Sequence, residues 1–243
     1  MAKLSREERE NPVSPELDDY SGPFRPDVKL TDFSKAGLLK LVEIGGAIYG
    51  AVHFGWYREV ERRFGHQVAE EIGHRAWFAD GGAGDTENQV ISTLMGFSNE
   101  TDETAPLKIN QLLPAMATRM KLVFEQQGEH EWLMKAQQCM VPENAEAQGP
   151  AALQKRCAEI CHHIELFGFR WGARRWNPNI RVDPLALPPR SSAAEPHCCW
   201  RYRLEDHAVD YVAEPGELVV KMGLQRDQDE RAAAESPVRY PKS

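Results

Sequence analysis

The stretch that decides the fold runs from residue 32 to residue 77 and reads DFSKAGLLKLVEIGGAIYGAVHFGWYREVERRFGHQVAEEIGHRAW. Its apolar residues recur every three or four positions, as on one face of an α-helix, at Leu38, Leu41, Val42, Gly45, Tyr49, Val52, Trp56, Val60 and Phe64. Ser34 can cap the start of this helix and Gly65 can end it. We therefore expect one helix about 45 Å long, unless the Gly45-Gly46 pair bends it, and a second helix ending near Trp77.

The rest of the chain carries further helical patterns and shorter strand-like ones. Three more helices are expected, over residues 86–97, 103–120 and 150–167. Pro114 should kink the middle one, because proline lacks an amide hydrogen and its ring crowds the preceding turn. Strands are expected on both sides of a QGEH turn and near the end, over residues 121–126, 131–140, 197–204 and 217–222. Good helix formers in the first two leave a helix open there.

Three segments lack these patterns. Residues 1–30 are rich in proline and charge, and we expect an extended N-terminal arm there. Residues 225–243 are expected to form a disordered tail, and residues 170–196 a long connection with little regular structure. The sequence thus predicts a single α+β domain over residues 31–224, with N-terminal helices packed on a small antiparallel sheet.

Composition excludes several classes of protein. The chain has 243 residues, a formal net charge of −8 and no dense Lys/Arg stripe, which argues against nucleic-acid binding. Its longest uncharged apolar stretch, Ile44–Tyr57, is too short to cross a bilayer, and the N-terminus lacks the apolar core of a signal peptide. Five cysteines without a secretory signal argue against a disulfide framework. We expect a cytoplasmic protein with reduced cysteines and no membrane partner.

A cluster of reactive residue types, CAEICHHIE, spans Cys157–Glu165 on the late helix. Glu159 and His163 are four residues apart and share a helix face. They could ligate one divalent metal ion, such as zinc, iron or manganese, or work as a catalytic acid–base pair. Cys161 is the candidate nucleophile. The alternative is that the cysteines face the core and the histidines lie at the surface or pair with carboxylates.

A second candidate site lies on the long first helix. His53 is the candidate catalytic acid–base group there, and Trp56 and Tyr57 are candidate substrate contacts. A buried imidazole needs a hydrogen-bond partner, so His53 can equally be a core residue that donates to a carbonyl. His74, on the second helix, has the same two interpretations, and a position at the surface is expected.

Trp171, Arg174 and Arg175 form a third candidate site, in which the ring and the guanidinium groups would hold an anionic aromatic or carboxylate substrate. They can equally form a polar surface segment whose tryptophan points inward. The sequence has no G-x-G-x-x-G, G-x-S-x-G or H-E-x-x-H pattern. No catalytic signature therefore identifies the reaction.

Residues 32–77 resemble an uncharacterised bacterial family of small cytoplasmic proteins with a long first helix and a second helix ending in Trp. The matching phrases are Gly55-Trp56-Tyr57, Val60-Glu61, Phe64-Gly65 and Trp77. Later parts of the chain look similar to that family and to aminothiazoline-carboxylate hydrolase-like proteins, at Cys139, Cys161 and Cys199-Trp200-Arg201-Tyr202. The resemblance covers about residues 32–204. It implies an α+β fold and hydrolysis of a small compound with a carbon–nitrogen or carbon–sulfur bond.

These observations favour a small-molecule catabolic enzyme, a hydrolase or a lyase. Its substrate would be a small compound that bears a carboxylate, and aromatic compounds are included in this class. The chemistry would be acid–base or metal-assisted, at His53, Glu159, Cys161 and His163. Two alternatives stay open. One is a small-molecule binding module without turnover, and the other is an accessory subunit that clasps a partner enzyme. The chain could also act as a homodimer.

Overall fold

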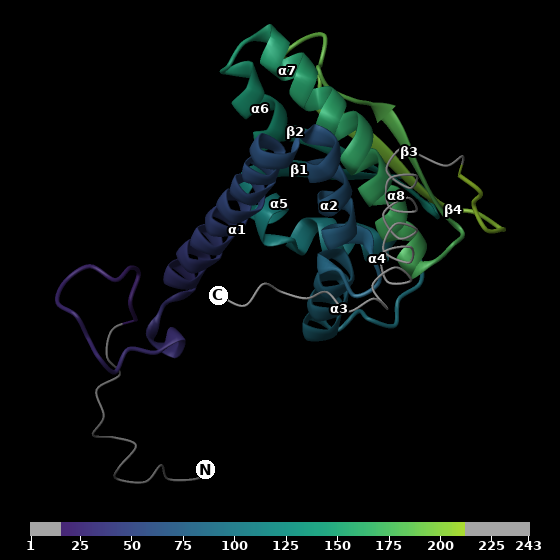
Figure 1. Ribbon diagram of the computed structural model, residues 1–243. Helices are drawn as coiled ribbons and strands as arrows, with labels where there is room; N and C mark the ends of the chain where they lie inside the picture. Colours follow the sequence, from purple (N-terminus) through teal and green to yellow (C-terminus); the bar gives the residue numbers. More distant parts are fainter. Residues whose placement is uncertain (1–15, 212–243) are drawn as a thin grey trace, which may run out of the picture.

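The computed structural model describes residues 16–211, and its architecture is the expected α+β class. A short turn, η2 (Leu30–Asp32), precedes the N-terminal helices, which are α1 (Lys35–Phe64), α2 (His66–Phe78), α3 (Ala83–Met95), α4 (Thr104–Leu112) and α5 (Pro114–Arg119). The second half contains β1 (Met120–Gly128), β2 (Glu131–Cys139), α6 (Met140–Glu146), α7 (Pro150–Arg156), the π-helical segment η3 (Cys157–Ile164), α8 (Glu165–Trp176), β3 (Ile180–Ala186) and β4 (Cys198–Leu204). Figure 1 shows α1 extending away from the rest of the domain toward its N-terminal end.

The four strands form one antiparallel sheet in the order β1-β2-β4-β3. Helices α4 and α8 cover one face of it. The core between these layers consists of Leu107, Met134, Ala173, Ile180, Val182, Trp200 and Tyr202. Removing these apolar surfaces from water joins the sheet and the helices into one unit.

The described part of the expected N-terminal arm is attached to the start of α1. Leu17 forms a β-bridge with Phe33. The predicted cap is confirmed, because the Ser34 hydroxyl accepts a hydrogen bond from the Gly37 amide at 3.1 Å. The expected strand over residues 217–222 and the expected tail over 225–243 lie outside the described residues.

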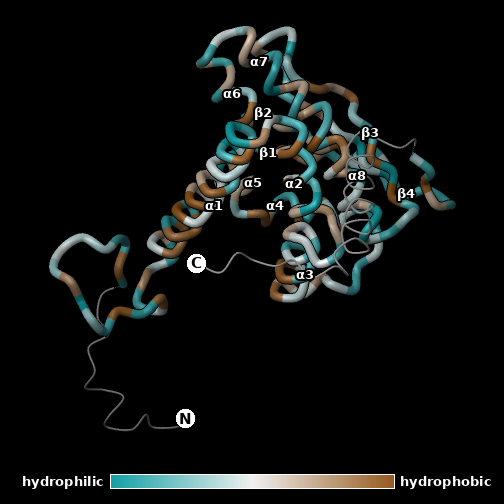
Figure 2. Tube along the Cα trace, in the orientation of Figure 1, coloured by the Kyte–Doolittle hydropathy of each residue, from teal (hydrophilic) through white to brown (hydrophobic). Residues whose placement is uncertain are grey.

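Helix α1 is long and apolar enough to cross a membrane, and among residues 16–211 it is the single helix of which this is true. Only 11% of the most apolar 18-residue stretch of this helix is buried. The exposed apolar side chains include Leu41, Ile44, Ile48 and Val52. Figure 2 shows apolar residues along this projecting part. The opposite face packs on α5 and α2, and a Cβ at Gly46 would lie 2.8 Å from the Pro114 carbonyl oxygen. The helix is thus both a packed element and an exposed apolar surface.

Three expectations about the elements need correction. The late helix does not stop at Gly168 but continues to Trp176. Gly168 does not end the helix; its lack of a side chain lets the Phe78 ring pack closely, since an added Cβ would lie only 3.1 Å from that ring. Residues 170–196, expected to be irregular, contain strand β3. This strand lies at the edge of the sheet, where a proline such as Pro184, which has no amide hydrogen to donate, is tolerated. Pro114 separates two helices instead of kinking one. The hairpin between β1 and β2 is confirmed.

Candidate functional site

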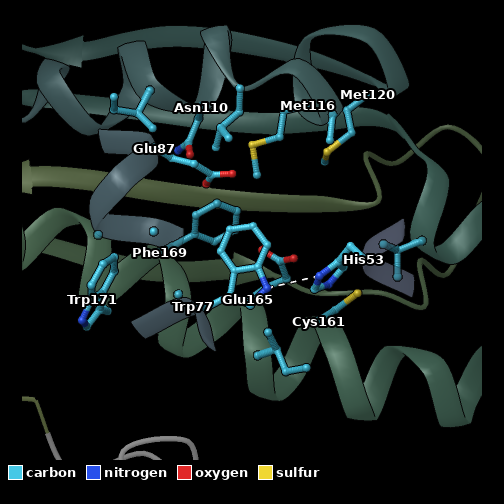
Figure 3. Close-up of a pocket in the computed structure, with 18 of the residues that line it drawn as sticks. His53, Trp77, Glu87, Asn110, Met116, Met120, Cys161, Glu165, Phe169 and Trp171 are labelled. Carbon is cyan, nitrogen blue, oxygen red and sulfur yellow. Dashed lines mark hydrogen bonds between the residues drawn. The ribbon is translucent and has the colours of Figure 1, made fainter. Parts of the chain in front are cut away.

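A partly open cavity of about 250 Å³ lies between helices α1 to α5, helix α8 and the sheet. Aromatic and aliphatic side chains form most of its wall. Figure 3 shows a few polar groups among them, contributed by His53 of α1, Glu87 of α3, Asn110 of α4 and Glu165 of α8. A mainly apolar cavity with a few convergent polar groups is the usual form of a small-molecule site.

The two carboxyl groups of the cavity are both poorly solvated. Glu87 accepts a hydrogen bond of 2.7 Å from the Tyr49 hydroxyl, and its burial raises the pKa of the carboxyl above its ordinary value. Burial raises the pKa of Glu165 further, to about 7. The Glu165 carboxyl forms no hydrogen bond or ion pair with another residue of the described chain. Carboxyl groups with such raised pKa values are typical of catalytic and ligand-binding sites.

His53 lies on the cavity side of α1, as a pocket residue would. Its Nδ1 accepts a hydrogen bond of 3.2 Å from the indole Nε1 of Trp77, the contact drawn in Figure 3. Burial lowers the pKa of His53, so the imidazole is neutral at pH 7. With Nδ1 as the acceptor, the proton of the neutral ring is on Nε2, which can donate a hydrogen bond.

Three cysteine side chains line the cavity, from Cys139, Cys161 and Cys198. Burial raises the pKa of Cys139 to about 12 and that of Cys198 to about 11, and it raises the pKa of Cys161 as well. A reactive cysteine needs a lowered pKa to be a thiolate near neutral pH. The surroundings of Cys161 therefore do not activate it as the nucleophile that its sequence position suggested.

No lysine or arginine lines the cavity within residues 16–211. Trp171 does line it, but the two arginines expected beside this tryptophan do not. Arg175 forms hydrogen bonds of 2.9 and 2.7 Å with the carboxylate of Asp85, and Arg174 lies against the Tyr211 ring. The expected carboxylate-binding cluster is thus divided between the cavity wall and the outer surface.

The neighbouring aromatic residues of α1, Trp56 and Tyr57, point in different directions from the helix. Tyr57 is buried and lines the cavity. Trp56, also expected to contact substrate, is 43% exposed and is not part of the wall. Neighbours on an α-helix point about 100° apart, so one position can reach the cavity and the other cannot.

Glu159 and His163 do not form the expected pair. Glu159 lies 3.5 Å from Lys155 and 3.9 Å from Arg156, near the α1–α2 corner. His163 contacts the carboxylate of Glu70 on α2 and lies beside His74. The expectation that His74 is at the surface is wrong, since it is only 1% exposed, and burial lowers its pKa to about 4.

Sequence reasoning missed the two carboxyl groups of the cavity. Glu165 ends the CAEICHHIE cluster, and its position between Ile164 and Leu166 is the one local sign that it is buried. Glu87 follows a glycine-rich turn and has no such sign. The π-helical turn at η3 was not expected either, although π-helical turns occur often at functional sites.

Comparison of the chain with protein-family models, with curated proteins and with solved structures gives no match. The function is therefore inferred from the geometry of the cavity.

Proposed function

We propose that the protein is a cytoplasmic enzyme that binds a small, largely apolar compound in the cavity and acts on it by acid–base chemistry, as a hydrolase or a lyase. One observation carries this proposal. Two carboxyl groups, from Glu87 and Glu165, and the neutral imidazole of His53 face a cavity whose wall is otherwise mainly apolar. Acid and base groups held around an apolar space are suited to proton transfer with a bound molecule.

The cavity residues suggest separate roles. Glu165 has no partner of its own among the described residues, so it is the group best placed to exchange a proton with the ligand. Glu87 is held by Tyr49 at 2.7 Å and would orient the ligand or act as the second acid–base group. His53 would donate a hydrogen bond through Nε2.

The charge of the cavity restricts the substrate. With two carboxyl groups and no cationic side chain among the described lining residues, the cavity favours an uncharged or cationic compound over a carboxylate. This changes the substrate class expected from Arg174 and Arg175. The resemblance to aminothiazoline-carboxylate hydrolase-like proteins still fits the proposed reaction class, but a substrate carboxylate would have to project out of this cavity.

Binding without turnover is the second candidate function. The protonated thiols and the predominantly apolar wall favour it, because they provide contact area without an activated nucleophile.

Binding can be tested with three compounds that share one ring and differ in charge: benzyl alcohol, benzylamine and benzoate. We expect the first two to raise the midpoint of thermal unfolding and to bind in calorimetry, and benzoate to do neither. A Cβ at Gly50, on the cavity wall, would meet no atom within 4 Å, so Gly50→Leu should fill the space and abolish binding. Gly45→Leu adds the same side chain on the exposed part of α1 and is the matched control. Equal binding by the Gly50→Leu variant would refute the cavity as the site.

Catalysis can be tested with phenylacetone in deuterated water, by following exchange of its carbon-bound protons by NMR. An acid–base site should accelerate exchange over buffer, and Glu165→Gln should reduce the acceleration by about 100-fold or more, the usual contribution of a general base. The folded state of this variant is checked by circular dichroism. Tight binding of phenylacetone with no accelerated exchange would favour the binding module over the enzyme.

A further inference from the structure

The imidazole of His74 is buried without a hydrogen-bond partner among the described residues. Its side chain is 1% exposed, and neither ring nitrogen has a hydrogen-bond partner in the described part of the chain. The rings of Phe78 and Phe167 lie against it, with centroids 5.5 and 5.4 Å away, and offer no polar atom. Burying a polar group without a partner destabilises a fold, so an unpaired imidazole at this place calls for an explanation.

Two other potential ligands lie next to His74. Glu70 precedes it by one helical turn on the same face of α2. His163 reaches the same place from η3, with its ring centroid 5.3 Å from that of His74 and its Nδ1 in contact with the Glu70 carboxylate. One ligand atom from each of the three residues lies within 4.8 Å of the others.

An ion pair between Glu70 and His163 accounts for only part of this arrangement. It satisfies His163 Nδ1, but His163 Nε2 is also buried without a partner, and His74 has none at all. A cation held between the three side chains would give one ring nitrogen of His74 a partner and would also be bound by the Glu70 carboxylate.

We propose that Glu70, His74 and His163 bind one divalent transition-metal ion, with zinc as the preferred metal. Two imidazoles and one carboxylate form a mixed nitrogen and oxygen ligand set that suits zinc, and iron(II) or manganese less tightly. The ion would join α2 to η3. None of the three ligands lines the cavity, so this site is separate from the proposed function and does not depend on it.

A second group of similar residues provides a natural control. Glu61, His66 and Glu159 also lie within 4.8 Å of one another, at the α1–α2 corner. The His66 side chain is 43% exposed and pairs with Glu61 at 3.2 Å, so it can be solvated and already has a partner. Nothing there requires a metal, and we propose none.

The experiment uses the full chain, stripped with EDTA and titrated with Co²⁺ and then Zn²⁺. We expect one equivalent of Co²⁺ to bind, to give visible d–d absorption bands, and to be displaced by Zn²⁺. His74→Leu should weaken binding by well over tenfold, since even outer-shell residues of metal sites contribute ten- to a hundredfold. His66→Leu should bind as the wild type does.

Glu70→Gln is the second test variant, because it preserves size and shape and guards against a folding defect in His74→Leu. Circular dichroism verifies that each variant is folded. Absence of stoichiometric Co²⁺ binding to the wild-type chain would overturn the proposal, and so would equal binding by folded His74→Leu or Glu70→Gln. The benzylamine assay does not involve this site, so its failure would leave the metal result intact.

Discussion

At the corner where α1 meets α2, Glu59 lies at the surface with Arg62 and Arg63, at 2.7 and 2.6 Å. Hydrogen bonds from these two guanidinium groups lower the pKa of Glu59 to about 2, and the bond from Arg62 has the larger effect. In the interior, Glu165 has no cationic partner among the described residues, and burial raises its pKa to about 7. The same residue type is thus a strong acid in one region and a weak one in the other. Surroundings set by the fold decide which.

The histidines of the two regions differ in the same way. His66 at the corner is 43% exposed and pairs with Glu61, whereas His74 in the interior is 1% exposed and unpaired within residues 16–211. Both are on α2, eight positions apart. Exposed groups can exchange partners with water at little cost, while buried groups depend on the partners that the fold provides.

The largest expected effect is a pH dependence of stability caused by Glu165. Its folded-state pKa of about 7 lies above the ordinary value of 4.5, so the folded protein holds a proton that the unfolded chain releases between these values. The stabilising contribution is full below pH 4.5 and is lost as the pH rises through about 7. The loss is at most about 3 kcal/mol, at about 1.4 kcal/mol per pH unit.

Urea unfolding of the wild type and Glu165→Gln measures this contribution, because glutamine imitates the protonated acid. The variant should gain on the wild type as the pH rises from 4.5 to 8. The matched surface variant, Glu59→Gln, should differ from the wild type by a constant amount over this range, since the pKa of Glu59 is lowered and its stabilising pairing is lost only as the pH falls from 4.5 toward 2. Parallel curves for the wild type and Glu165→Gln would contradict the interior assignment.

The next effect compares the two Glu–His pairs in metal-free protein. Glu70→Ala leaves the largely buried His163 ring without its carboxylate partner and should lower the free energy of unfolding by about 1–3 kcal/mol. Glu61→Ala removes the partner of exposed His66 and should cost less than about 1 kcal/mol. Urea unfolding of both variants in EDTA tests the comparison. Equal losses would mean that the two pairs do not differ in solvation as the structure indicates.

The smallest effect is expected on the exposed apolar face of α1. Ile48 is 59% exposed, so Ile48→Gln should change the free energy of unfolding by no more than about 0.5 kcal/mol. Urea unfolding at two protein concentrations gives the measurement. A larger loss that grows with concentration would show that this face is covered by another molecule in solution.

Local signals in the sequence were sufficient for much of the fold. The apolar period, the Ser34 cap and Gly65 delimited α1 nearly to the residue, and the QGEH turn located the first hairpin. The part beyond Gly168 was misjudged, because glycine ends helices in many proteins but here allows Phe78 to approach. A glycine carries no local mark that separates these two uses.

The candidate site was predicted less completely. His53 and Tyr57 were candidate site residues, with a core position also open for His53, and the structure places both in the cavity wall. The pairing of Glu159 with His163 rested on helical spacing alone, which fixes neighbours within one helix but not the partners that come from another. Arg175 was likewise assigned to a ligand, but Asp85, ninety positions earlier, binds it.

By itself the sequence determined the α+β class, the long first helix, the antiparallel hairpin and the acidic, cysteine-bearing composition, because these follow from periodicity and turn chemistry between near neighbours. Only the tertiary structure decided that Glu87 and Glu165 face one cavity, that His74 is buried, and that His163 joins Glu70 instead of Glu159. The physical reason is that burial and the contacts that create these sites join residues far apart in the chain, whose encounter depends on the packing of whole helices against the sheet.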